Sequence, residues 1–419
     1  MLENIKLLQL ERLQATLNRV FKEVPFYHRL FESVSFAPED FSALEDIKKI
    51  PFTTKEHLRE NYPYNFFAVP LREVVRIAAT AGTTGIPIVV GYTKKDLQSL
   101  REISANALKY FEIYKEDVIQ ITFHSGIFSS AFGLQSGAEA IGASVIPVNF
   151  EDPYKQLRIL QDYRTTVLVC TPSYALWLAE ILPQTEINVN SLFLKKIILC
   201  GEPFTEAQRK IIEQVFKVKV HNLYSNVEVF GPGIAYECPY GRLHFQEEYF
   251  LVEVINFETL EEVKVGEKGE LVITTLNKEA FPLIRFRTGD VVILKDRKCP
   301  CGSFYFSTSS ILGRKDEVII VRGLKFTPDQ IEKLLIKVIG DKPLYQIHLE
   351  KKAGLEEIVI LISLSEKFFS DSYLEQTQWK KQLEEELFLE LSIPIEVKFV
   401  EKASLEKKNG EIPKIIDKR

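Results

Sequence analysis

Short β-rich runs of apolar residues alternate with helical stretches through the middle of the chain. The helical stretches include PSYALWLAEIL at 172–182 and TEAQRKIIEQVF at 205–216. The apolar runs are VIQITF, GASVIPV, TTVLVC, KKIILC and KVKVHNLY, at 118–123, 142–148, 165–170, 195–200 and 217–224. Strands that alternate with helices are typical of a parallel sheet covered by helices, so the pattern predicts an α/β fold.

The pattern changes after Glu247. The runs YFLVEVIN (249–256), GELVITTL (269–276) and VVILKD (291–296) follow one another without helical segments, and VGEKGE (265–270) supplies a tight connection. Strands joined by turns are typical of an antiparallel sheet. We therefore expect an antiparallel β subdomain attached to the parallel sheet.

A second change near residue 313 predicts a separate domain. A short β-ribbon leads into a helix that begins at Thr327 and Pro328, and a strand (356–364), a charged helix (373–391) and a strand (395–401) follow. A chain of 419 residues exceeds the roughly 250–300 residues of one ordinary core. We predict a large N-terminal α/β domain at 1–312 and a small α+β domain at 313–419.

Composition and charge narrow the choice of partners. The chain is 46% hydrophobic, which is typical of a globular protein. Its net charge is −5, so no excess of positive charge is available to attract a polyanion. Nucleic acid and an anionic membrane surface are therefore poor partners. The first 21 residues predict an amphipathic helix and not a secretory signal, and no run reaches the roughly 20 apolar residues of a membrane span. We expect a cytosolic protein, either monomer or homodimer.

A glycine- and threonine-rich loop is the first candidate for chemistry. Within RIAATAGTTGIPIVVGYT (76–93), two β-like runs flank Thr80, Gly82, Thr83, Thr84 and Gly85. Glycines let the backbone approach an anion, and threonine hydroxyls and successive backbone N–H groups can surround phosphate oxygens. An ordinary glycine-rich hairpin is the alternative, because short motifs of this kind often match by chance.

The order of five motifs gives this loop its context. They are TAGTTGIP, LCGEPFT, HNLYSNVEVFGPGIAYEC, IRFRTGD and ILGRKDEVIIVRGLKFTPDQIE. This series resembles that of adenylate-forming enzymes over nearly the whole chain. GAEAIGASVIPV, KEAFPLIRFRTGD and the CxC segment are similar to the phenylacetate–coenzyme A ligase branch in particular. The resemblance implies an α/β fold with a mobile C-terminal lid domain that turns about a hinge at Asp316.

The resemblance also implies a reaction. A carboxylic acid, an aromatic or other apolar one, attacks the α-phosphate of ATP to give an acyl-adenylate, which then reacts with coenzyme A or with another thiol or amine, such as a carrier protein. Magnesium would be held by Glu228, and Arg314 would supply positive charge. Phe123 and His124 would border the acyl pocket.

The remaining matched residues would bind the nucleotide. Asp290 would accept the ribose hydroxyls, Tyr224 would lie against adenine, Asn222 would pair with its amino edge, and Gly201, Glu202 and Pro203 would form a backbone wall. The alternatives are ordinary ones: Glu228 and Asp290 as solvated loop charges, and Tyr224 as core packing.

Several positions depart from the family pattern. Glu411 follows Gly410 where the family presents a catalytic lysine, and a carboxylate there would repel both substrate anions. Lys407, Lys408 or Lys414 would have to replace that lysine. Ile86 and Ile88 stand where related enzymes offer a lysine, and Val227 replaces a hydroxyl residue. Ser225 and Asn226 either compensate or crowd the adenylate. These changes favour two alternatives: a nucleotide-binding scaffold or regulator, and a transferase that uses supplied acyl-adenylate.

Four residues predict a structural zinc site. Cys299-Pro300-Cys301-Gly302 is a short thiolate knuckle, and Cys238 and His244 lie upstream in YECPYGRLHF. Three cysteines and one histidine make a closed tetrahedral site of the kind that zinc prefers in a reducing compartment. The alternative is that Cys238 and His244 pack separately and that the CxC is a bare turn.

Overall fold

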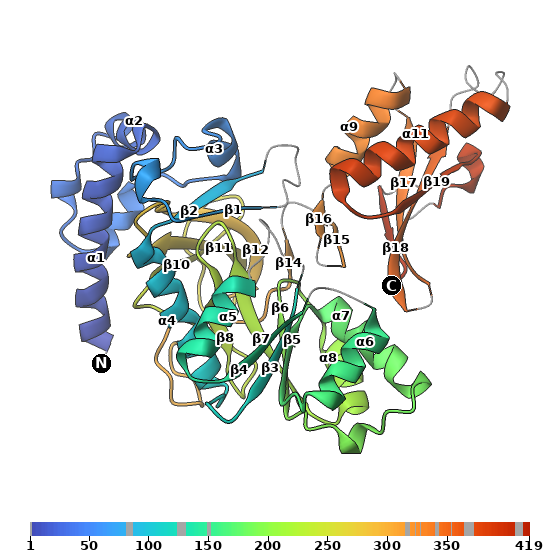
Figure 1. Ribbon diagram of the computed structural model, residues 1–419. Helices are drawn as coiled ribbons and strands as arrows, with labels where there is room; N and C mark the ends of the chain where they lie inside the picture. The colour runs from blue at the N-terminus through green and yellow to red at the C-terminus, as the bar shows by residue number, and fades with distance from the viewer. Residues whose placement is uncertain are drawn as a thin grey trace. The chain divides into compact units, whose positions relative to one another are not determined.

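A computed structural model describes residues 2–80, 87–123, 131–148, 152–314, 319–322, 324–326, 328–339, 343–352, 354–363, 373–406 and 414–419 (Figure 1). The described residues divide into two compact units, one ending at 314 and the other beginning at 319. Gly313–Arg314 forms strand β14, which pairs with a strand of the larger unit. The domain limits 1–312 and 313–419 stay a prediction.

A mixed sheet forms the centre of the larger unit. Its parallel part runs β7-β6-β5-β3-β4, and β8, β9 and β13 extend it in antiparallel fashion beyond β7. The strands are β3 (Val118–Thr122), β4 (Ser144–Val148), β5 (Val167–Cys170), β6 (Lys196–Cys200), β7 (Lys219–Asn226), β8 (Gly231–Glu237), β9 (Leu243–Phe245) and β13 (Ser307–Thr308). The predicted parallel strands are thus confirmed.

Helices cover both faces of the parallel part. One face of β5 packs with α6 (Pro153–Asp162), α7 (Pro172–Ile181) and α8 (Glu206–Phe216), and its other face packs with α4 (Lys94–Tyr110) and α5 (Ala131–Ala140). Strands buried on both faces read as continuous apolar runs, which explains the sequence TTVLVC. Helices α7 and α8 begin at threonine N-caps, since Thr171 and Thr205 each accept a hydrogen bond from a first-turn amide.

An antiparallel sheet completes the larger unit. It runs β10 (Phe250–Ile255), β11 (Lys268–Thr275), β12 (Phe286–Ile293) and β14, as the sequence after Glu247 predicts. The hairpin β1 (Arg76–Ala79) and β2 (Val89–Tyr92) flanks the phosphate loop. Its buried residues share one core with this sheet and with the N-terminal helices, which are α1 (Leu2–Glu23), α2 (Pro25–Ser33) and α3 (Lys55–Glu60).

The smaller unit is an α+β structure with its own core. Its main sheet runs β19 (Ile395–Phe399), β18 (Leu355–Ser363), β17 (Leu344–Lys352) and β20 (Ile415–Asp417), and α9 (Pro328–Ile339) and α11 (Tyr373–Leu391) pack on it. The hairpin β15 (Ile319–Val321) and β16 (Leu324–Phe326) contributes to the same core. The predicted fold class is confirmed. Among the described helices, none combines the length and the apolar character needed to cross a membrane.

Candidate active site and metal centre

The carboxyl edge of the parallel sheet gathers several of the predicted site residues. Phe123 follows β3, Thr171 follows β5, Gly201 follows β6 and Tyr224 lies near the end of β7. Strand β3 lies between β4 and β5, so the chain leaves it in one direction and returns on its other side. Ligands of open α/β sheets bind outside the carboxyl ends of the strands at such a switch point.

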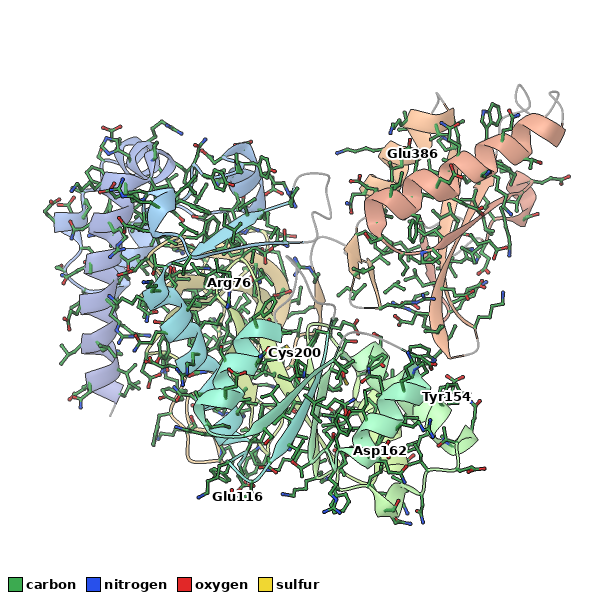
Figure 2. The ribbon with its side chains drawn as sticks, in the orientation of Figure 1. Arg76, Glu116, Tyr154, Asp162, Cys200 and Glu386 are labelled. Carbon is green, nitrogen blue, oxygen red and sulfur yellow. The ribbon has the colours of Figure 1, made fainter. Side chains whose placement is uncertain are left out.

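The predicted backbone wall begins where β6 ends, at Cys200 (labelled in Figure 2). Gly201 has φ +91°, a conformation that side-chain-bearing residues rarely adopt. The carboxylate of Glu202 accepts hydrogen bonds from the backbone N–H of Ser173 at 3.0 Å and from its hydroxyl at 2.9 Å. The Glu202 side chain therefore stabilises the start of α7, where a negative charge is favourable.

Tyr224, Asp290 and Arg314 form a buried polar cluster. The Tyr224 hydroxyl donates to Oδ2 of Asp290 at 2.5 Å, and Nη1 of Arg314 donates to Oδ1 at 2.7 Å. Arg314 also donates to the carbonyl of Thr288 at 3.0 Å. Strand pairing sets this contact, because Asp290 and Arg314 lie opposite each other on β12 and β14. The cluster thus links β7 to the antiparallel sheet.

Burial and charge make the Asp290 carboxylate a fixed hydrogen-bond acceptor. Asp290 is 5% exposed, and the Arg314 guanidinium compensates its charge. Burial, and then the charge of Asp290, raises the pKa of Tyr224 well above its usual value, so its hydroxyl stays a donor. A carboxylate offers about four acceptor positions, so Asp290 retains capacity for further hydroxyl donors. Asp290 is therefore not a solvated loop charge.

Asn222 and Asn226 are held within β7. The Asn222 side chain donates to the hydroxyl of Ser310 at 3.4 Å, and its backbone N–H donates to Glu237 at 3.0 Å. Oδ1 of Asn226 accepts the backbone N–H of Val229 at 3.1 Å, inside the turn that carries the half-buried Glu228. Asn226 thus shapes the turn that presents Glu228.

The base of the phosphate loop is closed by Thr80. Its backbone N–H donates to the carbonyl of Ile88 at 3.0 Å, and its hydroxyl accepts the N–H of Ile88 at 3.1 Å. The Ile88 side chain is buried in the core and Val227 packs against that core. Predicted residues that lie outside the described ones are Gly82, Thr83, Thr84, Gly85, Ile86, His124, Asp316, Lys407, Lys408 and Glu411.

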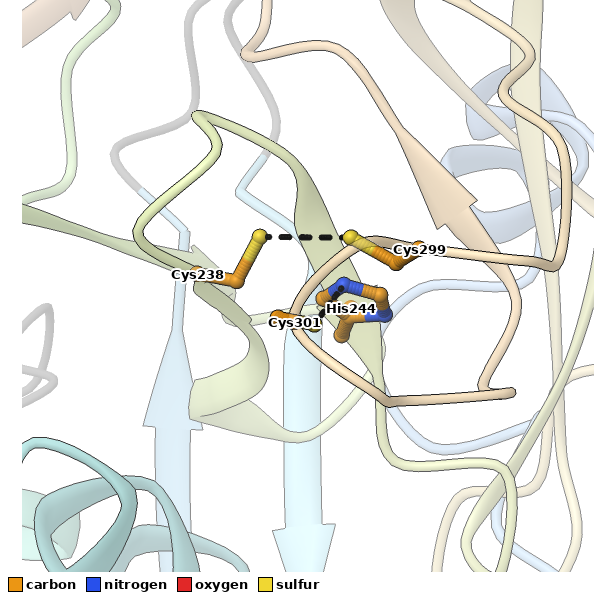
Figure 3. A group of neighbouring side chains, drawn as sticks. All are labelled: Cys238, His244, Cys299 and Cys301. Atoms are coloured by element: carbon orange, nitrogen blue, oxygen red, sulfur yellow. Dashed lines mark hydrogen bonds between the residues drawn. The ribbon is translucent and has the colours of Figure 1, made fainter.

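Three cysteines and one histidine converge at a second site (Figure 3). Cys238 follows β8, His244 lies on β9, and Cys299 and Cys301 lie in the loop before β13. The ligand atoms all lie within 4.8 Å of one another, which contradicts the alternative of separate packing. The Sγ atoms of Cys238 and Cys299 are 3.7 Å apart, and Sγ of Cys301 lies 3.4 Å from Nε2 of His244.

These distances fit a tetrahedral zinc ion. With Zn–S bonds of about 2.3 Å and Zn–N bonds of about 2.0 Å, the edges of the tetrahedron are about 3.8 Å between sulfurs and about 3.5 Å between sulfur and nitrogen. The two contacting pairs, at 3.7 Å and 3.4 Å, agree with these edges, and all four ligand atoms lie within 4.8 Å of one another. The donor set suits zinc in its chemistry, and its two contacting pairs have tetrahedral spacing.

Comparison with known proteins identifies the family. Residues 40–277 match the AMP-binding enzyme family, and residues 323–419 match the AMP-binding enzyme C-terminal domain. The chain belongs to the AMP-binding enzyme family. It is 40% identical to a phenylacetate-coenzyme A ligase of Thermus thermophilus over 371 residues, which are 88% of this chain and 83% of the relative. It is 34% identical to a phenylacetate-coenzyme A ligase of Escherichia coli, covering 100% of this chain and 95% of the relative.

Solved structures support the fold. A 2-hydroxyisobutyryl-CoA ligase crystallised with 2-HIB-AMP and CoA superposes with a TM-score of 0.90 at 23% identity, covering 98% of this chain and 89% of the other. An amide bond synthetase from Marinactinospora thermotolerans superposes with a TM-score of 0.59 at 17% identity, covering 82% and 68% of the two chains. The two relatives that are 40% and 34% identical to the chain, and not these structures, confirm the resemblance to the phenylacetate–coenzyme A ligase branch.

The larger unit contains a buried lysine, Lys278, that the sequence motifs did not assign to the site. Lys278 donates to the carbonyl of Val229 at 3.0 Å and to that of Glu228 at 3.5 Å. Burial lowers the pKa of Lys278 to about 7, against the opposing attraction of Asp96 and Glu228. Its position as the first residue of KEAFPLIRFRTGD, between two apolar runs, is the sequence signal that points to it.

Lys414 is the one proposed replacement for the missing lysine that lies among the described residues. Its Nζ forms an ion pair with Glu332 at 2.8 Å and lies 5.9 Å from the centre of the Tyr345 ring. These contacts are within the smaller unit. A substrate contact by Lys414 would therefore compete with the Glu332 ion pair.

Proposed function

We propose that the protein activates a carboxylic acid, of the aromatic class, with ATP and transfers the acyl group to coenzyme A. The Tyr224–Asp290–Arg314 cluster is the observation that carries the nucleotide-binding part of this proposal. The relatives named phenylacetate-coenzyme A ligase support the choice of acid and acceptor. We place the reaction in the cytoplasm, where ATP, coenzyme A and reduced thiols occur together.

Each residue of the site has a physical task in this reaction. Asp290 accepts the ribose hydroxyls, Tyr224 lies against the adenine, and the backbone of Gly201 and Pro203 borders it. The Glu228 carboxylate is a hard oxygen ligand suited to magnesium, which when bound offsets charge on the phosphate oxygens. The fixed charge of Arg314 keeps Asp290 oriented and adds to the positive potential near the nucleotide.

The chemistry has two balanced steps. In the first, an oxygen of the substrate carboxylate forms a bond to the α-phosphorus while the bond to pyrophosphate breaks. In the second, the thiolate of coenzyme A attacks the acyl carbon and AMP leaves. Because both steps develop charge on oxygen, preorganised donors and exclusion of water lower their barriers.

Exchange of labelled pyrophosphate into ATP tests this function. We expect exchange that depends on an added aromatic acid, and formation of the acyl–coenzyme A thioester when coenzyme A is present. Short aliphatic acids and amines, tested in parallel, define the substrate and the acceptor. A protein that binds ATP but shows no exchange with any acid in the panel is a scaffold or regulator instead. Conversion of supplied acyl-adenylate without exchange identifies a second-step transferase.

Glu411→Lys tests whether the missing lysine limits the first step. If Glu411 occupies the lysine position, the substitution replaces repulsion of the two substrate anions by attraction, and acid-dependent exchange should rise at least tenfold. That factor requires about 1.4 kcal/mol of recovered transition-state stabilisation. Conversion of supplied acyl-adenylate should remain nearly unchanged, which makes it the internal control. Unchanged exchange in a fully active protein means that another lysine performs the task.

We further propose that Cys238, His244, Cys299 and Cys301 hold one structural zinc ion. The match between their separations and a zinc tetrahedron supports this assignment. All four ligands come from the chain, so the site is closed and has no open position for substrate. The ion would tie the loop before β13 to the β8–β9 hairpin.

A further inference from the structure

The ammonium group of Lys278 is enclosed by aromatic rings. Lys278 is 1% exposed, and its Nζ lies 4.7 Å, 5.1 Å and 5.5 Å from the ring centres of Tyr92, Phe230 and Phe281. The negative faces of aromatic rings attract a cation, most strongly where water is excluded. A buried lysine is costly unless its donors and charge are satisfied, so this arrangement requires an explanation.

The partners of Lys278 lie on the turn that carries Glu228. Its Nζ donates to the carbonyls of Glu228 and Val229, and the hydroxyl of Tyr92 donates to the carbonyl of Phe230 at 3.0 Å. Buried side chains therefore hold three successive carbonyls of this turn. Tyr92 is the last residue of β2, the strand that leaves the phosphate loop.

The backbone around Lys278 is also held in place. Asp96, on α4, is fully buried and accepts the backbone N–H groups of Glu279 at 2.6 Å and Ala280 at 2.9 Å. Asp96 also accepts the N–H of Thr93, directly after β2. The segment 278–280, the end of β2 and the Glu228 turn are thus connected through one buried network.

We propose that Lys278 is a positioning residue that fixes the Glu228 turn against the phosphate-loop hairpin, and so sets where the Glu228 carboxylate meets the metal on ATP. This inference rests on the proposed function of Glu228. A neutral side chain of similar length would leave two turn carbonyls without their buried donor. The turn would then relax, and the carboxylate would lose its defined position relative to the phosphates.

A purely structural role predicts a different outcome. If Lys278 only fills the core, its replacement should lower stability and weaken all nucleotide binding to a similar extent. If it positions Glu228, its replacement should weaken metal-dependent binding of ATP much more than binding of AMP. AMP lacks the β- and γ-phosphates, so its binding reports on the ribose and adenine contacts, including those of Asp290 and Tyr224, and not on a metal held between the β- and γ-phosphates.

The experiment uses the full chain and compares Lys278→Met with wild type. Binding of AMP is measured by calorimetry, and binding of Mn²⁺ in the presence of non-hydrolysable ATP is measured by electron paramagnetic resonance. We expect Mn²⁺ affinity to fall at least tenfold and AMP affinity to change less than twofold. Lys278→Arg, which keeps the charge and donors, should recover part of the loss. Lys109→Met removes an exposed lysine from the last turn of α4 and should change neither value.

The possible outcomes separate the two proposals. Equal losses of AMP and Mn²⁺ affinity, or no loss of either, overturn the positioning role. If Lys278→Met does not fold, Tyr92→Phe serves instead, because it removes the neighbouring hydroxyl donor. This variant should lose less Mn²⁺ affinity than Lys278→Met would and should keep AMP binding intact. Unchanged Mn²⁺ affinity in Tyr92→Phe also overturns the proposal. Failure of wild type to bind AMP at all contradicts the proposed function itself.

Discussion

Asp290→Ala should remove most of the stabilisation of the protein by AMP and ATP. The carboxylate would accept both ribose hydroxyls, and hydrogen bonds to a charged group contribute about 1.5–3 kcal/mol each. Losing two of them weakens nucleotide binding by more than about 100-fold. At a ligand concentration of 100 times the wild-type Kd, the stabilisation falls from about 2.7 kcal/mol to a few tenths. Thermal unfolding with and without nucleotide measures this change.

The same substitution also removes a structural contact, so a matched control is needed. Asp290→Ala leaves Arg314 and the Tyr224 hydroxyl without their acceptor and should lower stability even without ligand. Glu253 and Arg285 form a comparable buried pair at 2.7 Å in the same sheet region. Glu253→Ala should destabilise the protein to a similar degree but preserve the nucleotide-induced shift. A full shift in Asp290→Ala would show that the ribose assignment is wrong.

Metal analysis should find about one zinc ion per chain, and its removal should destabilise the protein. Binding to the folded ligand set contributes directly to folding free energy, because the unfolded chain does not form the site. A metal present at about 1,000 times its Kd stabilises the folded state by about 4 kcal/mol. Chelation should therefore lower the unfolding midpoint by roughly 8 °C, at about 2 °C per kcal/mol. Differential scanning calorimetry before and after treatment with a chelator measures the loss.

Cysteine variants separate the metal site from ordinary packing. Cys299→Ala removes one ligand and should lower the zinc content well below one per chain. Cys170 is a buried cysteine on β5 that does not belong to the cluster, so Cys170→Ala should lose packing but keep its zinc. A metal-free wild type with unchanged stability in chelator would rule out the zinc site.

Local patterns predict the secondary structure and the fold class well. The runs VLVC and IILC become the central parallel strands β5 and β6, because strands covered by helices on both faces need apolar residues at nearly every position. The change of pattern after Glu247 correctly predicts the antiparallel sheet. Periodicity and turn residues are properties of neighbouring positions, so they are visible without tertiary structure.

The partners within the site are less accessible to such reasoning. The sequence shows that Tyr224, Asp290 and Arg314 match family motifs, but not that one carboxylate joins the other two side chains. From the sequence, Ile88 stands where related enzymes place a phosphate contact. In the folded chain, the Ile88 side chain is buried in the core. Both facts depend on strand register and on the side to which each side chain points.

The family, the α/β architecture, the motifs predicted to bind nucleotide and the four candidate zinc ligands could all be recognised without the folded structure. Which of these side chains meet is visible only in the folded chain. The four ligand atoms lie within 4.8 Å of one another, Asp290 accepts hydrogen bonds from Tyr224 and Arg314, and Lys278 donates to carbonyls of the Glu228 turn. These contacts join residues that are far apart in the chain. Their geometry follows from sheet pairing and core packing, which no local pattern encodes.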